Sequence, residues 1–112
     1  MSIVKINDDT NYIPFDKYGM VIDGILWRNI SYDDMTNHGS YILKFEKDIK
    51  SIPHIHEGYE EFLILEGEIR DSNGDIYKKG DFVTYGPNTH HSVIALKSTK
   101  ILVFMRGFNR IV

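Results

Sequence analysis

Apolar residues along this chain come in short runs separated by turn-forming residues, which is the pattern of an all-β protein. The stretch Ser40 to Lys47 alternates large apolar side chains with their neighbours and predicts a strand with one buried face. Glu61 to Leu65 is the most apolar run, and Phe82 to Tyr85, His91 to Leu96 and Ile101 to Met105 predict three further strands. No segment keeps a helical periodicity over about ten residues, so we predict a fold built from strands.

Two turn signals predict hairpins between neighbouring strands. Asn73-Gly74 lies between the runs Gly67 to Asp71 and Asp75 to Lys78, and Asn-Gly favours a tight type I′ turn. Asp23-Gly24 divides the apolar residues between Met20 and Ile30 and predicts a second hairpin. Hairpins join antiparallel strands, so we expect an antiparallel barrel or sandwich.

The length of 112 residues suits one domain with a single core. We expect this domain to span residues 1–112, with a leading strand and a loop over 1–17 and the barrel over roughly 18–108. Apolar positions within residues 3–6 mark the leading strand. A small barrel with open strand edges is expected to extend its sheet through a second copy, so we predict a homodimer.

Composition narrows the environment and the partners of the protein. The net charge is −3 and there is no basic run, so we expect no nucleic-acid partner. The chain has no cysteine, which excludes disulfides and thiolate metal ligands. It shows neither a signal-peptide pattern nor a stretch of membrane-spanning length. We therefore predict a cytoplasmic protein with no membrane partner.

The candidate chemistry begins with two histidines. His54 and His56 are two residues apart, so on an extended strand both imidazoles project from one face. A turn over residues 57–59 then leads to Glu60 and Glu61, which point to opposite faces of the next strand, so that only one can join the histidines. Two imidazoles and a carboxylate predict a first-row metal site with an open side.

A further metal ligand is expected after the turn at Pro87, where His90 and His91 precede an apolar strand. Neighbouring residues again face opposite ways, so one of the two histidines joins the site and the other is exposed. His38 lies in a polar loop beside a glycine, and we interpret it as a surface residue.

These patterns resemble the two motifs of the cupin family. The first motif is His-x-His, three residues, Glu, six residues and Gly, and it is filled by His54, His56, Glu60 and Gly67. The second motif is Gly, a strand, a Pro-containing turn and His, and it is filled by Gly80, Pro87 and His91. The segment 60–68 and an upstream Trp27-Arg28 resemble the branch that holds the metal-binding domain of ChrR-type anti-sigma factors and the acetylacetone-cleaving dioxygenases. The resemblance covers roughly residues 25–106.

The resemblance implies an all-β cupin fold, a double-stranded β-helix or jelly-roll barrel. It also implies one divalent transition metal ion (Fe, Mn, Ni or Zn) with the ligands His54, His56, Glu60 and His91. Two turns depart from the family pattern, because Asp48 and Asn88 stand where the family has glycine. Asp and Asn tolerate the left-handed backbone region, so we expect both turns to be preserved.

Catalytic candidates beyond the metal ligands are His90, Tyr85 and Arg106. The strand positions that we expect to face inward near the metal are Tyr41, Leu43, Phe45, Phe62, Ile64, Tyr85, Phe104 and Arg106. Arg106 has two alternative interpretations, pairing with a substrate oxygen or pairing with Glu66 or Glu68. Trp27 is expected either to line the pocket or to plug one end of the barrel.

Three functions remain open from the sequence. The resemblance favours a metal-dependent dioxygenase-like enzyme acting on a small oxygenated substrate of dicarbonyl or enol type. The iron-binding relatives that cleave acetylacetone use histidines alone, whereas this chain adds Glu60. The ChrR-like relatives imply a metal- or ligand-binding module without catalysis. A redox-neutral isomerase or lyase would need a further acid or base, for which His90 and Tyr85 are the candidates.

Overall fold

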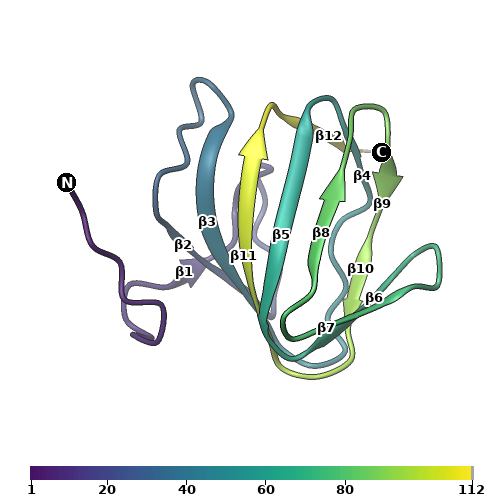
Figure 1. Ribbon diagram of the computed structural model, residues 1–112, viewed down its shortest axis with the longest axis horizontal. Helices are drawn as coiled ribbons and strands as arrows, with labels where there is room; N and C mark the ends of the chain where they lie inside the picture. Colours follow the sequence, from purple (N-terminus) through teal and green to yellow (C-terminus); the bar gives the residue numbers. More distant parts are fainter. Residues whose placement is uncertain (112) are drawn as a thin grey trace.

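The computed structural model describes residues 1–111, which form twelve strands and no helix (Figure 1). The largest sheet runs in the order β1 (Ile13–Pro14), β2 (Ile25–Asn29), β3 (His38–Phe45), β11 (Thr99–Arg106), β5 (Tyr59–Glu66) and β8 (Phe82–Tyr85). A second sheet contains β10 (Val93–Ala95), β6 (Glu68–Asp71) and β7 (Ile76–Lys78). The third contains β12 (Asn109–Ile111), β4 (His54–His56) and β9 (His90–His91).

All paired strands are antiparallel, as predicted. Figure 1 shows β3, β11, β5 and β8 side by side, with β4, β9 and β12 gathered near the C-terminal end of the chain. Within residues 1–111, the three sheets enclose a core without merging into one continuous barrel. No helix in this part of the chain could cross a membrane.

The core lies on the inner face of the six-stranded sheet. Its inward positions are alternate residues of three neighbouring strands, namely Tyr41 and Phe45 on β3, Phe62 and Ile64 on β5, and Ile101, Val103 and Met105 on β11. Each large apolar side chain buried in this way contributes about 1.5–3 kcal/mol. Glu60 has the same orientation as Phe62 and Ile64, so β5 delivers a carboxylate to an otherwise apolar interior.

The strand predicted at the N-terminus is wrong. Residues 3–6 form no strand, and the leading strand is the two-residue β1 further along the chain, paired with β2. Side-chain contacts and not strand pairing join the intervening segment to the sheet, because Asp9 pairs with Lys44 of β3 at 3.3 Å and with Lys100 of β11 at 3.2 Å. Asn11 also takes a positive φ of 67°, which bends the chain before β1 begins.

The hairpin predicted across Asp23-Gly24 is only half present. The residues after the turn form β2, but those before it do not run beside β2. The Ile22 amide donates instead to the Phe15 carbonyl, and the Ile25 amide donates to the Ile22 carbonyl. The upstream arm is therefore folded into its own loop, and β1 takes the pairing edge that the arm would have used.

The predicted hairpin of β6 and β7 is confirmed, whereas its type I′ turn is wrong. That turn would need positive φ at both Asn73 and Gly74, but only Gly74 has it, at 96°. The Asp71 amide donates to the Asp75 carbonyl, so the loop contains three residues rather than two. A loop of three residues needs one left-handed position, at its end, and glycine supplies it.

The two turns that carry Asp48 and Asn88 in place of glycine are preserved. Asp48 has a φ of 72° and Asn88 a φ of 67°, both in the left-handed region as predicted. The Asn88 amide donates to the His56 carbonyl at 2.7 Å, so this turn also supports β4.

Candidate metal centre

Strand β4 carries two of the four site residues. His54 and His56 are both buried, and Ile55 between them faces the other way, which confirms the predicted alternation. Strand β9 pairs with β4 so that His91 lies directly opposite His54. His91 is buried whereas its neighbour His90 is exposed, which is the arrangement expected for a single inward histidine.

The fourth residue comes from the start of β5. Glu60 is 6% exposed and faces the histidines, whereas Glu61 faces outward and pairs with Arg106 at 3.4 Å. The short connection from β4 to β5 passes very close to the end of β11. A Cβ atom on Gly58 would lie 2.1 Å from the Arg106 carbonyl oxygen, so this position requires glycine.

Donor atoms of these four side chains converge on one point. His54 Nε2 lies 3.0 Å from His91 Nε2 and 3.3 Å from Glu60 Oε2, and His91 Nε2 lies 3.9 Å from the same oxygen. One ligand atom from each residue lies within 4.8 Å of the others. His56 Nε2 also contacts the Glu60 carboxylate, yet it has no partner with hydrogen-bond geometry in the described chain.

The opposite nitrogen of each imidazole is engaged outside this group. His54 Nδ1 lies 2.8 Å from the Ile52 carbonyl, His56 Nδ1 lies 2.7 Å from Thr89 Oγ1, and His91 Nδ1 lies 3.1 Å from Asp71 Oδ2. Such contacts orient the rings and leave Nε2 facing inward, which is how metal-ligating histidines are commonly held.

The electrostatics of the group suit a cation. Burial alone would raise the pKa of Glu60, but the imidazoles of His54, His56 and His91 around its carboxylate hold that pKa well below its usual value, so the carboxylate is ionised. Burial lowers the pKa of His56 more than the Glu60 carboxylate raises it, which favours the neutral imidazole. Neutral imidazoles and a carboxylate form a donor set that fits a metal ion, and the four residues could hold one.

A chain of polar contacts behind His91 was missed by the sequence analysis. Asp71 lies between the His91 ring and the Tyr85 hydroxyl, which donates to the carboxylate, and Tyr77 lies 3.3 Å further out. Tyr85 also stacks on His91, with ring centroids 4.1 Å apart. Asp71 stands at the start of a turn in the sequence, where acidic residues are common, so nothing marked it as a partner of a histidine.

Two residues beside Glu60 were also missed. The Asn109 amide nitrogen lies 3.2 Å from Glu60 Oε2 and 3.0 Å from the Tyr18 hydroxyl. Burial raises the pKa of Tyr18, so its hydroxyl stays protonated. A small cavity of about 30 Å³ borders His54 and Glu60, with Tyr18 and Tyr41 in its wall. These residues come from opposite ends of the chain, and no local signal could have connected them.

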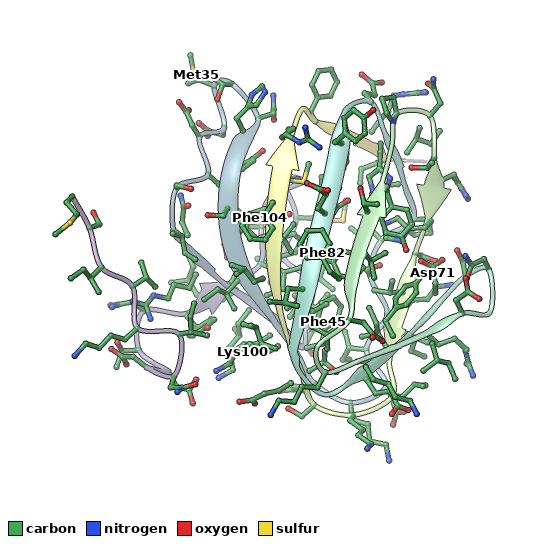
Figure 2. The ribbon with its side chains drawn as sticks, in the orientation of Figure 1. Met35, Phe45, Asp71, Phe82, Lys100 and Phe104 are labelled. Carbon is green, nitrogen blue, oxygen red and sulfur yellow. The ribbon has the colours of Figure 1, made fainter. Side chains whose placement is uncertain are left out.

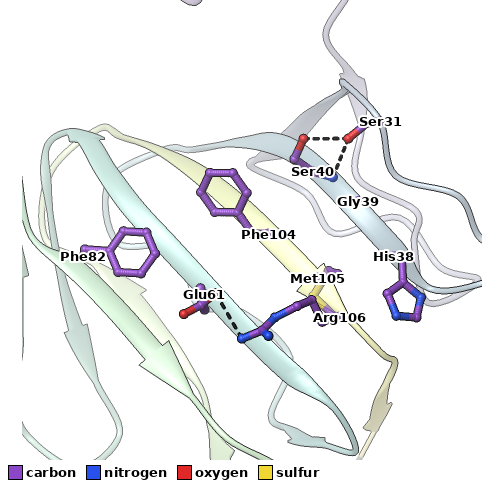
Figure 3. Close-up of a pocket in the computed structure, with 9 residues that line it drawn as sticks. All are labelled: Ser31, His38, Gly39, Ser40, Glu61, Phe82, Phe104, Met105 and Arg106. Carbon is purple, nitrogen blue, oxygen red and sulfur yellow. Dashed lines mark hydrogen bonds and ion pairs between the residues drawn. The ribbon is translucent and has the colours of Figure 1, made fainter.

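The structure contradicts two of the expected inward positions. Phe104 is 36% exposed, and Arg106 is exposed on the outer face of β11, because Val103 and Met105 take the inward positions. Figure 3 shows Arg106 directed toward Glu61 in an outer cleft bordered by Phe82, Phe104 and His38. The expected pairing of Arg106 with Glu66 or Glu68 is therefore wrong, and neither Arg106 nor the exposed His90 reaches the four-residue group.

Trp27 lies at one end of the core rather than beside the four residues. Its ring packs edge-on against Phe15, with centroids 5.1 Å apart, and against Tyr41, with centroids 5.4 Å apart. It also borders a cavity of about 390 Å³ with Lys17, Tyr18 and Asn109. Tyr18 borders both this cavity and the small one, so the two spaces are neighbours.

Comparison with known proteins gives a family and a fold. The family model described as a ChrR cupin-like domain matches residues 4–108. A comparison with curated proteins finds no match in sequence.

Several solved structures are similar. A putative acetylacetone dioxygenase from Methylibium petroleiphilum has a TM-score of 0.80 at 16% identity, covering 100% of this chain and 85% of its own. An acetylacetone dioxygenase from Acinetobacter johnsonii has a TM-score of 0.77 at 20% identity, covering 94% and 74%. The Rhodobacter sphaeroides complex of SigE with the anti-sigma ChrR gives 0.69 at 19% identity, covering 88% of this chain and 51% of that one. These likenesses confirm the predicted jelly-roll cupin fold.

Proposed function

We propose, from the premise that this chain belongs to the family of ChrR cupin-like domains, that it is a metal-dependent enzyme of dioxygenase type. Its substrate would be a small oxygenated molecule of dicarbonyl or enol type. The observation that carries the proposal is the convergence of four buried donor atoms beside a cavity inside the fold. Two structurally similar proteins are described as acetylacetone dioxygenases, one of them putatively, which supports the reaction class.

We propose His54, His56, Glu60 and His91 as the ligands of one divalent transition metal ion. Nitrogen and carboxylate donors suit Fe(II), Mn(II), Ni(II) and Zn(II). When bound, such an ion supplies Lewis acidity toward an enolisable oxygen and coordination sites for small molecules.

The residues around the site would hold its geometry and exclude water. Asn109 fixes Glu60 Oε2 from one side, and Asp71 fixes the His91 ring from the other. Phe15, Tyr18 and Tyr41 form an aromatic wall beside His54, and such a wall keeps solvent from a reactive intermediate. Of the catalytic candidates, only Tyr85 borders the group, and we propose that it positions His91 through Asp71.

A second candidate function is metal or ligand binding without catalysis. It is supported by the likeness to the structure of the anti-sigma protein ChrR in complex with SigE. That chain is about twice as long as the part matched here, so its partner does not transfer directly. We retain the homodimer and the cytoplasmic location as proposals, together with a small-molecule partner.

Elemental analysis of untagged protein, purified without added metal, tests the proposal first. About one equivalent of iron, manganese or nickel per chain supports the enzyme. The iron-loaded protein should then consume O₂ with an enolisable dicarbonyl, whereas the metal-free protein should not. Stoichiometric zinc with no O₂ consumption after exchange for iron would favour the binding function, and absence of metal after reconstitution would contradict both.

A further inference from the structure

Lys17 carries an ammonium group that is buried inside the protein. It lies in the loop between β1 and β2, and its ammonium is buried with no hydrogen-bond partner among residues 1–111. Three tyrosine rings surround it, with Nζ 4.9 Å from the Tyr18 centroid, 5.2 Å from that of Tyr32 and 5.6 Å from that of Tyr41. The side chain therefore points inward instead of extending into solvent.

This placement is unfavourable for folding unless the charge is used. Burying an ammonium without an opposite charge costs several kcal/mol, and cation–π contacts recover only part of that. Burial lowers the pKa of Lys17 to about 8, against an opposing effect from the negative charge of Glu60, so the ammonium still predominates at neutral pH. The Lys17 ammonium therefore has no anion within hydrogen-bond distance in the described chain, and a bound anion would stabilise it.

A cavity lies where that anion could enter. Lys17 borders the space of about 390 Å³ together with Trp27, Tyr32 and Asn109. The Trp27 indole nitrogen is a second buried donor without an acceptor in the described chain. Two carboxylates also border the cavity, Asp16 and Asp34, but both are exposed and neither is a hydrogen-bond partner of the Lys17 ammonium. Lys17 and Trp27 thus border the cavity with buried donors close to its wall, whereas its acidic groups are exposed.

The cavity is connected to the metal centre by two side chains. Asn109 borders it and contacts Glu60 at 3.2 Å, and Tyr18 borders both it and the small cavity beside His54. A molecule bound against Lys17 would therefore lie next to the residues that hold Glu60. This adjacency distinguishes the space from the outer cleft at Phe104, which lies on the opposite face of the sheet.

We propose that Lys17 binds the carboxylate of a small organic acid in this cavity, with the aromatic rings packed against the apolar body of the acid. The inference rests on the proposed function for regarding this acid as a substrate. It narrows the substrate class from oxygenated molecules in general to anionic ones, such as the β-keto acids. Lys17 would act as a binding residue, supplying the opposite charge at a position that excludes water.

The test compares acids with their uncharged esters, by calorimetric titration of zinc-loaded and of metal-free protein. The probes are acetoacetate and benzoylacetate, each paired with its methyl ester. The wild type should bind at least one acid roughly tenfold more tightly than its ester, as expected for a hydrogen-bonded charge pair. Lys17→Met should remove this preference, Lys17→Arg should keep most of it, and the exposed Lys79→Met should leave it unchanged.

The outcomes separate this inference from the proposed function. Three results would overturn the inference. Lys17→Met could keep the preference for the acid, the wild type could show no such preference, or no probe could bind to the wild type. A Lys17-dependent preference in a protein whose iron form consumes no O₂ would overturn the enzyme and leave the inference standing. Thermal unfolding of Lys17→Met controls for folding, since removal of the buried charge should raise the midpoint rather than lower it.

Discussion

His56 is the most completely buried of the four site residues, because it is 0% exposed, and its Nε2 contacts the Glu60 carboxylate. We predict that His56→Ala reduces bound metal from about one equivalent per chain to near zero, because one of the four proposed ligands is lost. His38→Ala should leave the metal content unchanged, since His38 is exposed on the outer face. Metal analysis with circular dichroism checks this. Equal loss in both variants would exclude the assigned ligands.

Asp71 should matter to metal affinity although it does not join the four donors. Its carboxylate orients His91, and loss of such a partner typically weakens metal binding by about 10–100-fold. We predict a decrease of this size for Asp71→Asn in competition titrations with a zinc chelator. Asp75→Asn, in the same hairpin but exposed, is the matched control. An affinity equal to that of the wild type would show that Tyr85 and the backbone orient His91 without Asp71.

Lys17 leads to a prediction about stability and pH. Its pKa is about 8 in the folded protein, against 10.5 for a lysine in the unfolded chain, so between these values the unfolded chain binds more protons. The contribution of Lys17 to the free energy of unfolding should therefore rise as pH increases from about 8 to 10.5. Lys17→Met should lack this rise and should be more stable at pH 7 by ~1–3 kcal/mol. Urea unfolding of both proteins across this range is the measurement, and a less stable variant would contradict it.

At the scale of the element, β11 shows when the alternation of apolar residues cannot predict the buried face of a strand. The sequence placed Phe104 and Arg106 inward, but β11 is apolar at consecutive positions from Ile101 to Met105, so alternation could not define the buried face. The pairing of β11 with β5 shifts register between Lys100 and Ile101, and such an irregularity changes which residues face the core. By contrast, β4 contains polar residues on one face only, and its orientation was predicted correctly.

The tight connection between β4 and β5 leads to a prediction about Gly58. A side chain there would collide with the Arg106 carbonyl and with Gly107, both backbone groups that cannot move independently of β11. Gly58→Ala should therefore separate β4 from β5, lower the unfolding midpoint and weaken metal binding, because His56 and Glu60 flank this turn. Gly86→Ala is the control, since its new Cβ would make only an ordinary contact of 3.7 Å. Similar midpoints for the two variants would contradict the argument.

At the scale of the whole molecule, the outer face of the six-stranded sheet exposes two aromatic side chains. Phe82 is 56% exposed and Phe104 36%, with their ring centroids 6.3 Å apart (Figure 2). The sequence predicts a homodimer joined through open strand edges, and we propose this aromatic pair as an alternative contact between the two copies.

Sedimentation across a concentration series tests the dimer. Phe104→Lys should weaken association at least about tenfold, because a charge would be buried at the contact. Met35→Ser removes a more exposed apolar side chain, 87% exposed, from a loop away from Phe104 and should have no effect (Figure 2). A monomer at every concentration would contradict the proposed homodimer.

The sequence by itself determined the all-β class, the antiparallel pairing and the four residues that converge on one point. These follow from local patterns, since strand alternation places His54 and His56 on one face and two motifs with defined spacing select Glu60 and His91. Asp48 and Asn88 were predictable for the same reason, because left-handed turns depend on single residues.

Only the tertiary structure decided which residues surround that site. Lys17, Tyr18 and Asn109 meet because β12 pairs with β4 and because the loop before β2 folds over the open end of the core. Asp71 reaches His91 because β6 pairs with β10, which follows His91 closely in the chain, so that Asp71 lies opposite Val93. Such contacts join segments tens of residues apart, and they depend on strand register and side-chain packing. They therefore cannot be predicted from periodicity or motif spacing.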